Sequence, residues 1–370
     1  MIRRISGLTA SILVVLTTTF ALAHTPQQAP HQLYKMGDLK LESGEVIKDF
    51  AISYVTHGTL NAKKSNAILM VTAISGNHHR LDFMIGPGKA LDTDKYFVIA
   101  TDAIGNGLTT SPSNSTAQPR MQFPKFLIRD MVTSQHRLLT EHLGINHVVA
   151  VVGPSMGGMQ VLQWGVSHPD FMDSLVSLVP LATTPAWTVA VLEASRKAIM
   201  LDPAWNKGNY ESPPEHGVRL WRDILFLAAR SPEAYRDQFK NALDVLPWLQ
   251  QQETNLLKVF DANNWIYQTW AYEKHDVGTT PGMNGDAAKA LQSIKAKTLI
   301  LLGVKDLLNP EWEPADAARS IRDAKVVTIN PQSITGHAAA GGGIPADVDF
   351  INRTTTEFLD VVTDHGKKLN

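Results

Sequence analysis

The chain of 370 residues is long enough to bury a large core, either in one big domain or in a core with an insertion. Its 34 Lys and Arg residues face 35 Asp and Glu residues, which leaves a net charge of −1, and no basic block stands out. This balance argues against nucleic acid or an anionic membrane surface as a binding partner.

The N-terminal segment has the layout of a secretory signal peptide. Arg3 and Arg4 precede an apolar stretch that runs through Leu16, and a small-x-small site ends at Ala23. A membrane anchor is the alternative, but the apolar run is short and ends in three threonines. We therefore expect residues 1–23 to be a signal peptide and the mature protein to be periplasmic or secreted in a bacterium. No stable membrane insertion is expected after cleavage.

The body of the chain alternates between strand and helix patterns. Residues 36–57 alternate around a turn at Ser43-Gly44, which predicts an opening hairpin. Helical spacing from Ile128 to Leu143 ends at Gly144, a natural helix stop. Short apolar runs predict buried parallel strands at residues 67–73, 96–102, 147–153, 174–182 and 298–303. This alternation predicts an α/β protein with a mostly parallel, doubly wound sheet.

The alternation of strand and helix patterns stops at residues 183–297, which are rich in tryptophan and have helical patterns without clear strands. We interpret this segment as a helical cap inserted into a core formed by residues 30–182 and 298–365. We interpret the tryptophans of the cap as packing residues rather than as platforms that stack on sugars. Contact between the caps of two copies would form a homodimer, which is a further expectation.

Ser155 lies in Gly153-Pro154-Ser155-Met156-Gly157, between a strand pattern and a helix pattern. Small flanking residues are needed where a serine occupies a sharp strand-to-helix turn that exposes its oxygen as a nucleophile. The following helix directs its N-terminal N–H groups at charge that develops near that oxygen. This context predicts a nucleophile elbow rather than an ordinary turn.

An α/β hydrolase supplies its triad in the order Ser, Asp, His. Asp306 follows the last predicted strand, at the sheet edge where functional residues gather. His337 lies in a small-residue loop before the final helix, expected near residues 347–362, whereas its rival His365 lies in the charged tail. In this triad His337 takes the Ser155 proton, and Asp306 fixes the imidazole tautomer. The predicted fold class is therefore the α/β-hydrolase fold with an inserted helical cap.

An oxyanion hole needs two N–H donors. One is expected from Met156, the residue after the nucleophile, and the other from the loop at residues 71–79. That loop carries His78-His79, but no third ligand follows at a useful spacing for a metal. Residues 86–89 lack the first glycine and the Ser/Thr of a phosphate loop. No metal and no cofactor are expected.

Four stretches closely resemble the homoserine O-acetyltransferase family of the α/β-hydrolase superfamily: residues 81–107, 123–139, 147–164 and 194–210. The resemblance covers nearly all of the mature chain. It implies catalytic roles for Ser155, Asp306 and His337, the second oxyanion-hole position for Ile74, and a substrate-carboxylate contact for Arg196.

One departure from the family concerns the residue after the histidine. The family carries an aspartate there that holds the ammonium group of homoserine, and this chain has Ala338. A charged hydrogen bond of this kind contributes about 1.5–3 kcal/mol. An exported protein would also meet little acyl-CoA. The leading hypothesis is therefore an exported serine esterase that cleaves a small carboxylic ester through an acyl-enzyme.

Two other hypotheses stay open at this point. The first is an O-acyltransferase that passes the acyl group from the same acyl-enzyme to an alcohol. The second is a non-catalytic binding or scaffold protein that retains the fold. The joint presence of the elbow, Asp306 and His337 argues against the scaffold.

Overall fold

One eight-stranded sheet organises the computed structural model, which describes residues 30–257 and 259–368. The strand order is β1-β2-β4-β3-β5-β6-β7-β8. The predicted signal peptide, residues 1–23, lies outside the described residues. All elements belong to the compact unit His31–Asn370. The strands are β1 Gln32–Lys40, β2 Val46–His57, β3 Ala67–Val71, β4 Phe97–Thr101, β5 Val148–Pro154, β6 Met172–Leu178, β7 Lys297–Leu302 and β8 Ala324–Thr328.

The predicted hairpin and parallel strands are all present. Strands β1 and β2 pair antiparallel, β2 pairs antiparallel with β4, and the remaining neighbours are parallel. The edge strand β8 was not predicted from the sequence. Its residues are half-buried or exposed, so it lacks the continuous apolar run that marks the inner strands. The fold class is thus a mostly parallel, doubly wound α/β sheet, as expected.

The inner strands β3 to β7 are buried at nearly every position and mostly apolar, because both faces of the sheet are covered. Alternate residues enter two separate core clusters, as successive side chains of a strand point to opposite faces. In β3, for example, Leu69 joins the first cluster and Ile68 the second. Helices α1, α2, α8 and α9 supply the first cluster, and α10 supplies the second.

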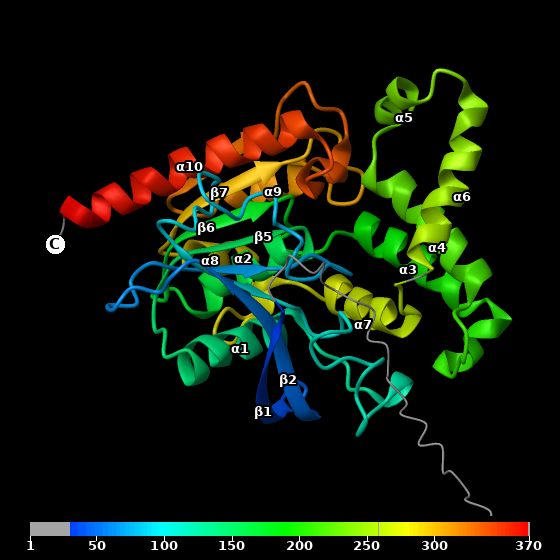
Figure 1. The fold of residues 1–370 in the computed structure, drawn as a ribbon, viewed down its shortest axis with the longest axis horizontal. Helices are drawn as coiled ribbons and strands as arrows, with labels where there is room; N and C mark the ends of the chain where they lie inside the picture. Colours follow the sequence, from blue (N-terminus) through cyan, green and yellow to red (C-terminus); the bar gives the residue numbers. More distant parts are fainter. Residues whose placement is uncertain (1–29, 258, 369–370) are drawn as a thin grey trace, which may run out of the picture. The chain divides into compact units, whose positions relative to one another are not determined.

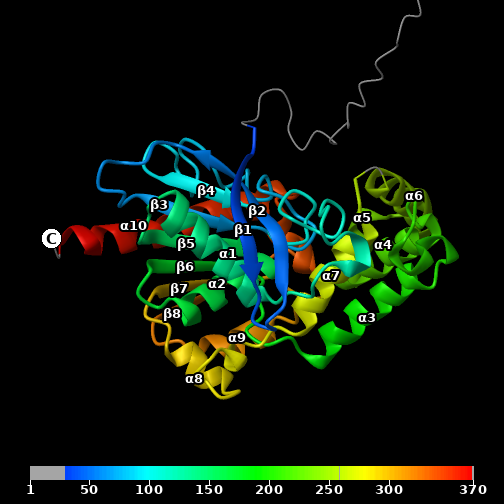
Figure 2. The same cartoon turned by 90° about the horizontal axis from the view of Figure 1, so that it is seen from below.

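Figures 1 and 2 show these helices in place around the sheet. The α-helices are α1 Ile128–Arg137, α2 Met156–Ser167, α3 Ala186–Met200, α4 Glu215–Ala229, α5 Pro232–Gln238, α6 Val245–Leu256, α7 Ala262–Glu273, α8 Ala287–Gln292, α9 Trp312–Ala318 and α10 Pro345–Lys368. The short helices are η1 Arg120–Gln122, η2 Leu138–His142, η3 Pro203–Gly208, η4 Ala242–Asp244, η5 Val277–Thr279 and η6 Gly336–Gly341. The predicted helix over residues 128–143 is α1 extended by the π-helical turn η2.

The chain between β6 and β7 is helical, from α3 to α8. Helices α3 to α6 lie together beyond one end of the sheet, next to α7 (Figures 1 and 2), whereas α8 packs on α2 at the sheet face. The cap exposes four leucines, Leu220, Leu227, Leu243 and Leu246. A homodimer through the cap stays a prediction. None of the described helices combines the length and apolar character that a bilayer crossing requires.

The strand order reverses direction at β3, and this reversal positions the site. The chain goes from β3 to β4 on one side and later returns to β5 on the other side of β3. The loops after β3 and β5 therefore leave in opposite directions, and in open α/β sheets ligands bind in the crevice expected at such a point, outside the carboxyl ends of the strands. Ser155 directly follows β5 and lies at this crevice.

Candidate active site

Ser155 occupies a strained turn between β5 and α2. Its φ is +56° with ψ −121°, a region that residues with a side chain rarely adopt. The close approach of β3 explains the flanking glycines. A Cβ on Gly153 would lie 2.7 Å from Val71 Cγ2, and one on Gly157 would lie 2.6 Å from the Val71 carbonyl oxygen. The predicted strand–turn–helix context of this motif is therefore present, and it holds the serine at the crevice.

The structure brings Ser155, His337 and Asp306 into one hydrogen-bonded chain. His337 Nε2 lies 2.8 Å from Ser155 Oγ, and His337 Nδ1 lies 2.7 Å from Asp306 Oδ2. Asp306 is buried, and its second oxygen accepts hydrogen bonds from the backbone N–H groups of Leu308 and Asn309, both at 2.8 Å. This is the geometry of a nucleophile, a base and an orienting carboxylate. The side chain of the rival His365 lies outside those described.

The loop after β3 lies against the start of α2. The carbonyl oxygens of Val71 and Thr72 both face Gly157, and Gln160 Nε2 donates to the Thr72 oxygen at 3.1 Å. Met156 is fully buried as the first residue of α2, and Ile74 is half-buried in the loop. Both candidate oxyanion donors thus belong to segments that adjoin the elbow, while their role stays a prediction.

Helix α7 of the cap supplies groups to the site that the sequence analysis missed. Asn264, Gln268 and Tyr272 are spaced by four residues, so they share one side of the helix. Asn264 Nδ2 donates to Ser113 Oγ at 2.7 Å. Gln268 accepts from the Ser75 N–H at 2.9 Å and donates to the Ile104 carbonyl at 3.2 Å. The signal that could have found them is this polar spacing within a helix that is buried almost throughout.

Arg196 on α3 is buried and bound to two carboxylates. Its Nη2 lies 2.7 Å from Glu193 Oε2 and 2.5 Å from Glu273 Oε2. Its Nη1 is buried without a hydrogen-bond partner in the part of the chain that the structure describes. Buried N–H groups are usually paired, so Nη1 retains the capacity to bind a carboxylate oxygen. The contact with a substrate carboxylate stays a prediction.

His78 and His79, in the loop after β3, are each held by an aspartate. His78 is fully buried; its Nδ1 lies 2.7 Å from Asp102 Oδ2, and its backbone N–H donates to the other Asp102 oxygen at 2.9 Å. His79 Nδ1 lies 2.8 Å from Asp82 Oδ2. Among the described residues, no three His, Cys, Asp or Glu side chains are grouped as metal ligands. The carboxylate of Asp102 therefore anchors the loop after β3.

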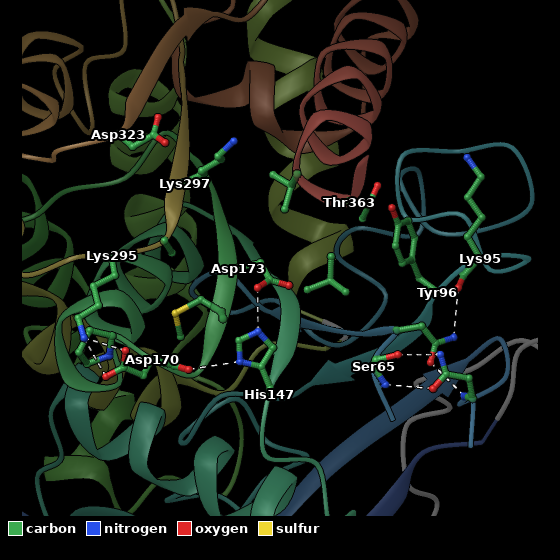
Figure 3. Close-up of a pocket in the computed structure, with 17 residues that line it drawn as sticks. Ser65, Lys95, Tyr96, His147, Asp170, Asp173, Lys295, Lys297, Asp323 and Thr363 are labelled. Atoms are coloured by element: carbon green, nitrogen blue, oxygen red, sulfur yellow. Dashed lines mark hydrogen bonds and ion pairs between the residues drawn. The ribbon is translucent and has the colours of Figure 1, made fainter. Parts of the chain in front are cut away.

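A groove of about 1080 Å³ lies at the amino ends of the strands, opposite to the ends that carry Ser155 and Asp306. Figure 3 shows two pairs among its charged side chains, His147 with Asp173 and Lys295 with Asp170. His147 Nε2 lies 2.9 Å from Asp173 Oδ1, and Lys295 Nζ lies 2.8 Å from Asp170 Oδ1. None of the triad residues lines this groove. Ligands of open α/β sheets bind at the carboxyl ends instead, so we place the candidate active site at the Ser155 crevice.

Comparison with known proteins agrees with this fold. Residues 66–333 match the model of the alpha/beta hydrolase fold family. An acetylester hydrolase from Corynebacterium glutamicum has a similar structure, with a TM-score of 0.85 and 30% identity over 90% of this chain and 96% of that one. The protein is thus an enzyme of the α/β-hydrolase superfamily.

Comparison with relatives in sequence identifies the family within this superfamily. The homoserine O-acetyltransferase of Methanosalsum zhilinae is 38% identical over 88% of this chain and 74% of its own length. The structure of the homoserine O-acetyltransferase from Bacillus anthracis superimposes with a TM-score of 0.79, at 28% identity over 89% of this chain and 97% of that one. The chain belongs to the homoserine O-acetyltransferase family, as its motifs indicated. These relatives support acyl transfer, the alternative in the sequence analysis, better than ester hydrolysis.

Proposed function

We propose that the protein is an O-acyltransferase that carries a short acyl group on Ser155 and passes it to a hydroxyl acceptor. The observation that carries this proposal is the chain of hydrogen bonds from Asp306 through His337 to Ser155 Oγ, at 2.7 and 2.8 Å. Such a chain activates a serine hydroxyl for attack on an acyl carbon. The names of the curated relatives support an acetyl group as the acyl group.

The proposed reaction has two halves. In the first half, the Ser155 proton moves to His337 Nε2 while Oγ bonds to the acyl carbon of the donor. The N–H groups of Met156 and Ile74 receive the oxyanion, and His337 returns the proton to the leaving group. In the second half, the acceptor hydroxyl loses its proton to His337 and attacks the acyl-enzyme. His337 then gives this proton to Ser155 Oγ as the acyl–Ser155 bond breaks. Asp306 stabilises the imidazolium in both halves.

The acceptor proposed for this site is a hydroxy acid without an ammonium group. Nη1 of Arg196 is a buried donor that an acceptor carboxylate would satisfy. Ala338, half-buried beside His337, provides a methyl group where an ammonium would need a carboxylate. A polar partner that is missing from a site can change discrimination by several orders of magnitude.

Ester hydrolysis is the second candidate. Ala338 favours it because a site that does not grip its acceptor leaves the acyl-enzyme open to water. The likeness to the acetylester hydrolase from Corynebacterium glutamicum supports it as well. Both candidates use the same acyl-enzyme, so the test must measure how the acyl group partitions between the acceptor and water.

The experiment supplies the acyl group from p-nitrophenyl acetate and, in parallel, from acetyl-CoA. The acceptors are homoserine and 4-hydroxybutyrate, which differ only by the amino group. We expect O-acetyl product in excess of free acetate, with 4-hydroxybutyrate the better acceptor. Acetate as the sole product at saturating acceptor would reject the transferase and leave the esterase.

Ser155→Ala serves as the control for both donors. Its turnover is expected to fall by at least about a thousandfold, because loss of a triad nucleophile elsewhere costs more than that. Normal circular dichroism and thermal melting would show that the variant folds. Substantial turnover by this variant would reject the acyl-enzyme on Ser155 for both candidates.

A further inference from the structure

The first turn of the cap holds the loop that carries Asp306. Strands β6 and β7 are parallel neighbours, and the chain leaves β6 toward α3 as it leaves β7 toward Asp306. The start of α3 therefore lies at the same edge of the sheet as this loop. Trp187 Nε1 donates to the Leu307 carbonyl at 2.5 Å. Thr188 Oγ1 donates to the Leu308 carbonyl at 2.6 Å.

These two carbonyls belong to the peptide units that bind the catalytic carboxylate. The Leu307 carbonyl and the Leu308 N–H form one unit, and the Leu308 carbonyl and the Asn309 N–H form the next. Both N–H groups donate to Asp306 Oδ1 at 2.8 Å. A trans peptide unit is planar, and its C=O and N–H point to opposite sides. Each unit therefore connects a donor of the cap on one side to Asp306 on the other.

Burial separates this arrangement from ordinary packing. Thr188 and Leu308 are buried, and a buried carbonyl needs a hydrogen-bond donor, which the Thr188 hydroxyl supplies. Trp187 is 56% exposed, so burial of its ring does not explain its position. The interaction that fixes this indole is the hydrogen bond from its N–H to the Leu307 carbonyl.

Other helices of the cap bind both ends of the same loop. Lys305, just before Asp306, forms an ion pair with Glu233 of α5. Tyr272 of α7 donates to Asn309 Oδ1 at 2.7 Å. Since the cap binds residues on both sides of Asp306, the position of this carboxylate depends on how the cap packs on the sheet.

We propose that Trp187 and Thr188 are positioning residues for the triad. They orient the two peptide units that hold Asp306 Oδ1, and Oδ2 is thereby directed at His337 Nδ1, 2.7 Å away. Hydrogen bonds in a chain polarise one another, so a donor at each carbonyl also strengthens the N–H donor of the same unit. The inference rests on the proposed function, because it concerns a triad that acylates Ser155. It makes the alignment of the triad depend on the docking of α3.

The test follows a single event at Ser155, which separates it from the choice of acceptor. Wild type and variants are treated with a p-nitrophenyl phosphonate, and release of p-nitrophenol gives the second-order rate of Ser155 modification. Thr188→Val keeps the shape of the side chain and removes the hydroxyl, whereas Trp187→Phe removes the indole N–H. We expect each change to lower the rate by at least about threefold, and the double variant to lower it about 10- to 100-fold.

Two variants separate positioning from stability. Thr188→Ser keeps the hydroxyl and loses a buried methyl group, so it should lower the melting temperature while its rate stays within twofold of wild type. Thr298→Val is the matched control, at a buried threonine at the amino end of β7 whose hydroxyl donates to the Ala296 carbonyl at 3.1 Å. We expect Thr298→Val to leave the rate unchanged.

Proton NMR reports on the contact between Asp306 and His337 without any reaction. The low-field resonance of His337 Nδ1–H is assigned by its absence in His337→Gln. We expect it to be the same in wild type and Thr298→Val, and to shift upfield or broaden in the double variant of Trp187 and Thr188, because its hydrogen bond to Asp306 is less well aligned.

Three results would overturn the inference. They are a double variant that reacts within threefold of wild type, equal rate losses in Thr188→Ser and Thr188→Val, and a resonance that is unchanged in the double variant. All three leave the acyl-enzyme intact, since wild type still reacts. A wild type that took up no phosphonate would instead reject the proposed function, and this inference with it.

Discussion

At the scale of single residues, the site depends on how little space the elbow leaves. Gly157 has no room for a Cβ because the Val71 carbonyl approaches to 2.6 Å of that position, while Gly343, in the loop before α10, has nothing within 4 Å. The small residues of the elbow thus let the loop after β3 reach the first turn of α2. This close approach brings the backbone expected to bind the oxyanion next to Ser155.

Ala338 is the residue that we expect to decide the acceptor. Ala338→Asp should improve homoserine relative to 4-hydroxybutyrate about 10- to 100-fold, because a charged hydrogen bond to the ammonium contributes about 1.5–3 kcal/mol. The measurement is kcat/KM for O-acetylation of each acceptor. Ala338→Asn is the control, since it has the same size without the charge. An unchanged acceptor ratio in Ala338→Asp would show that Ala338 does not face the acceptor.

At the scale of elements, α7 joins the cap to the catalytic loops. Its side chains contact the loop after β4 through Asn264, the loop after β3 through Gln268, and the loop after β7 through Tyr272. Glu273 at its end binds Arg196 of α3. The inserted segment therefore forms part of the site through hydrogen bonds to its loops.

Gln268→Leu tests this role of α7. The change removes the acceptor of the Ser75 N–H, a hydrogen bond that contributes about 0.5–1.5 kcal/mol, and loosens the loop that carries Ile74. We expect a loss of about 10-fold or more in kcat with little change in KM, measured on p-nitrophenyl acetate. Gln163→Leu, at a buried glutamine of α2 that contacts Ser167 and Thr280, is the control. A similar loss of kcat in both variants would indicate a general effect of buried polar groups.

At the scale of the whole molecule, the strand order gathers distant segments at one edge of the sheet. Ser155 follows β5, Asp306 follows β7, and His337 lies in η6 before α10. Parallel strands deliver their carboxyl ends to the same edge, so these segments meet although 182 residues separate Ser155 from His337. The paired charges of the groove in Figure 3 occupy the other edge.

Export is a prediction about the whole chain. We propose that residues 1–23 are cleaved and that the mature protein begins at about His24 in the periplasm, because Arg3, Arg4 and the following apolar stretch form a signal-peptide pattern. Cell fractionation with N-terminal sequencing checks this expectation. An intact N-terminus in the cytoplasmic fraction would contradict it and would make acetyl-CoA an accessible donor.

The sequence by itself determined the opening hairpin, the inner strands of the sheet, the elbow and the order of the triad. These are local properties: a buried parallel strand is a continuous apolar run, and the elbow is a pattern of neighbouring residues. Asp306 could be predicted because it directly follows such a strand. Edge strand β8 could not, because its half-exposed residues carry no such run.

The tertiary structure alone decided which groups of the cap reach the site. The Ser75–Gln268 hydrogen bond joins residues 193 apart, and no local pattern indicates which side of α7 meets which loop. The same holds for the hydrogen bond between Tyr272 and Asn309 and for Arg196 between two glutamates. Periodicity in the sequence reports that a helix is buried, whereas its partners depend on how the inserted segment packs on the sheet.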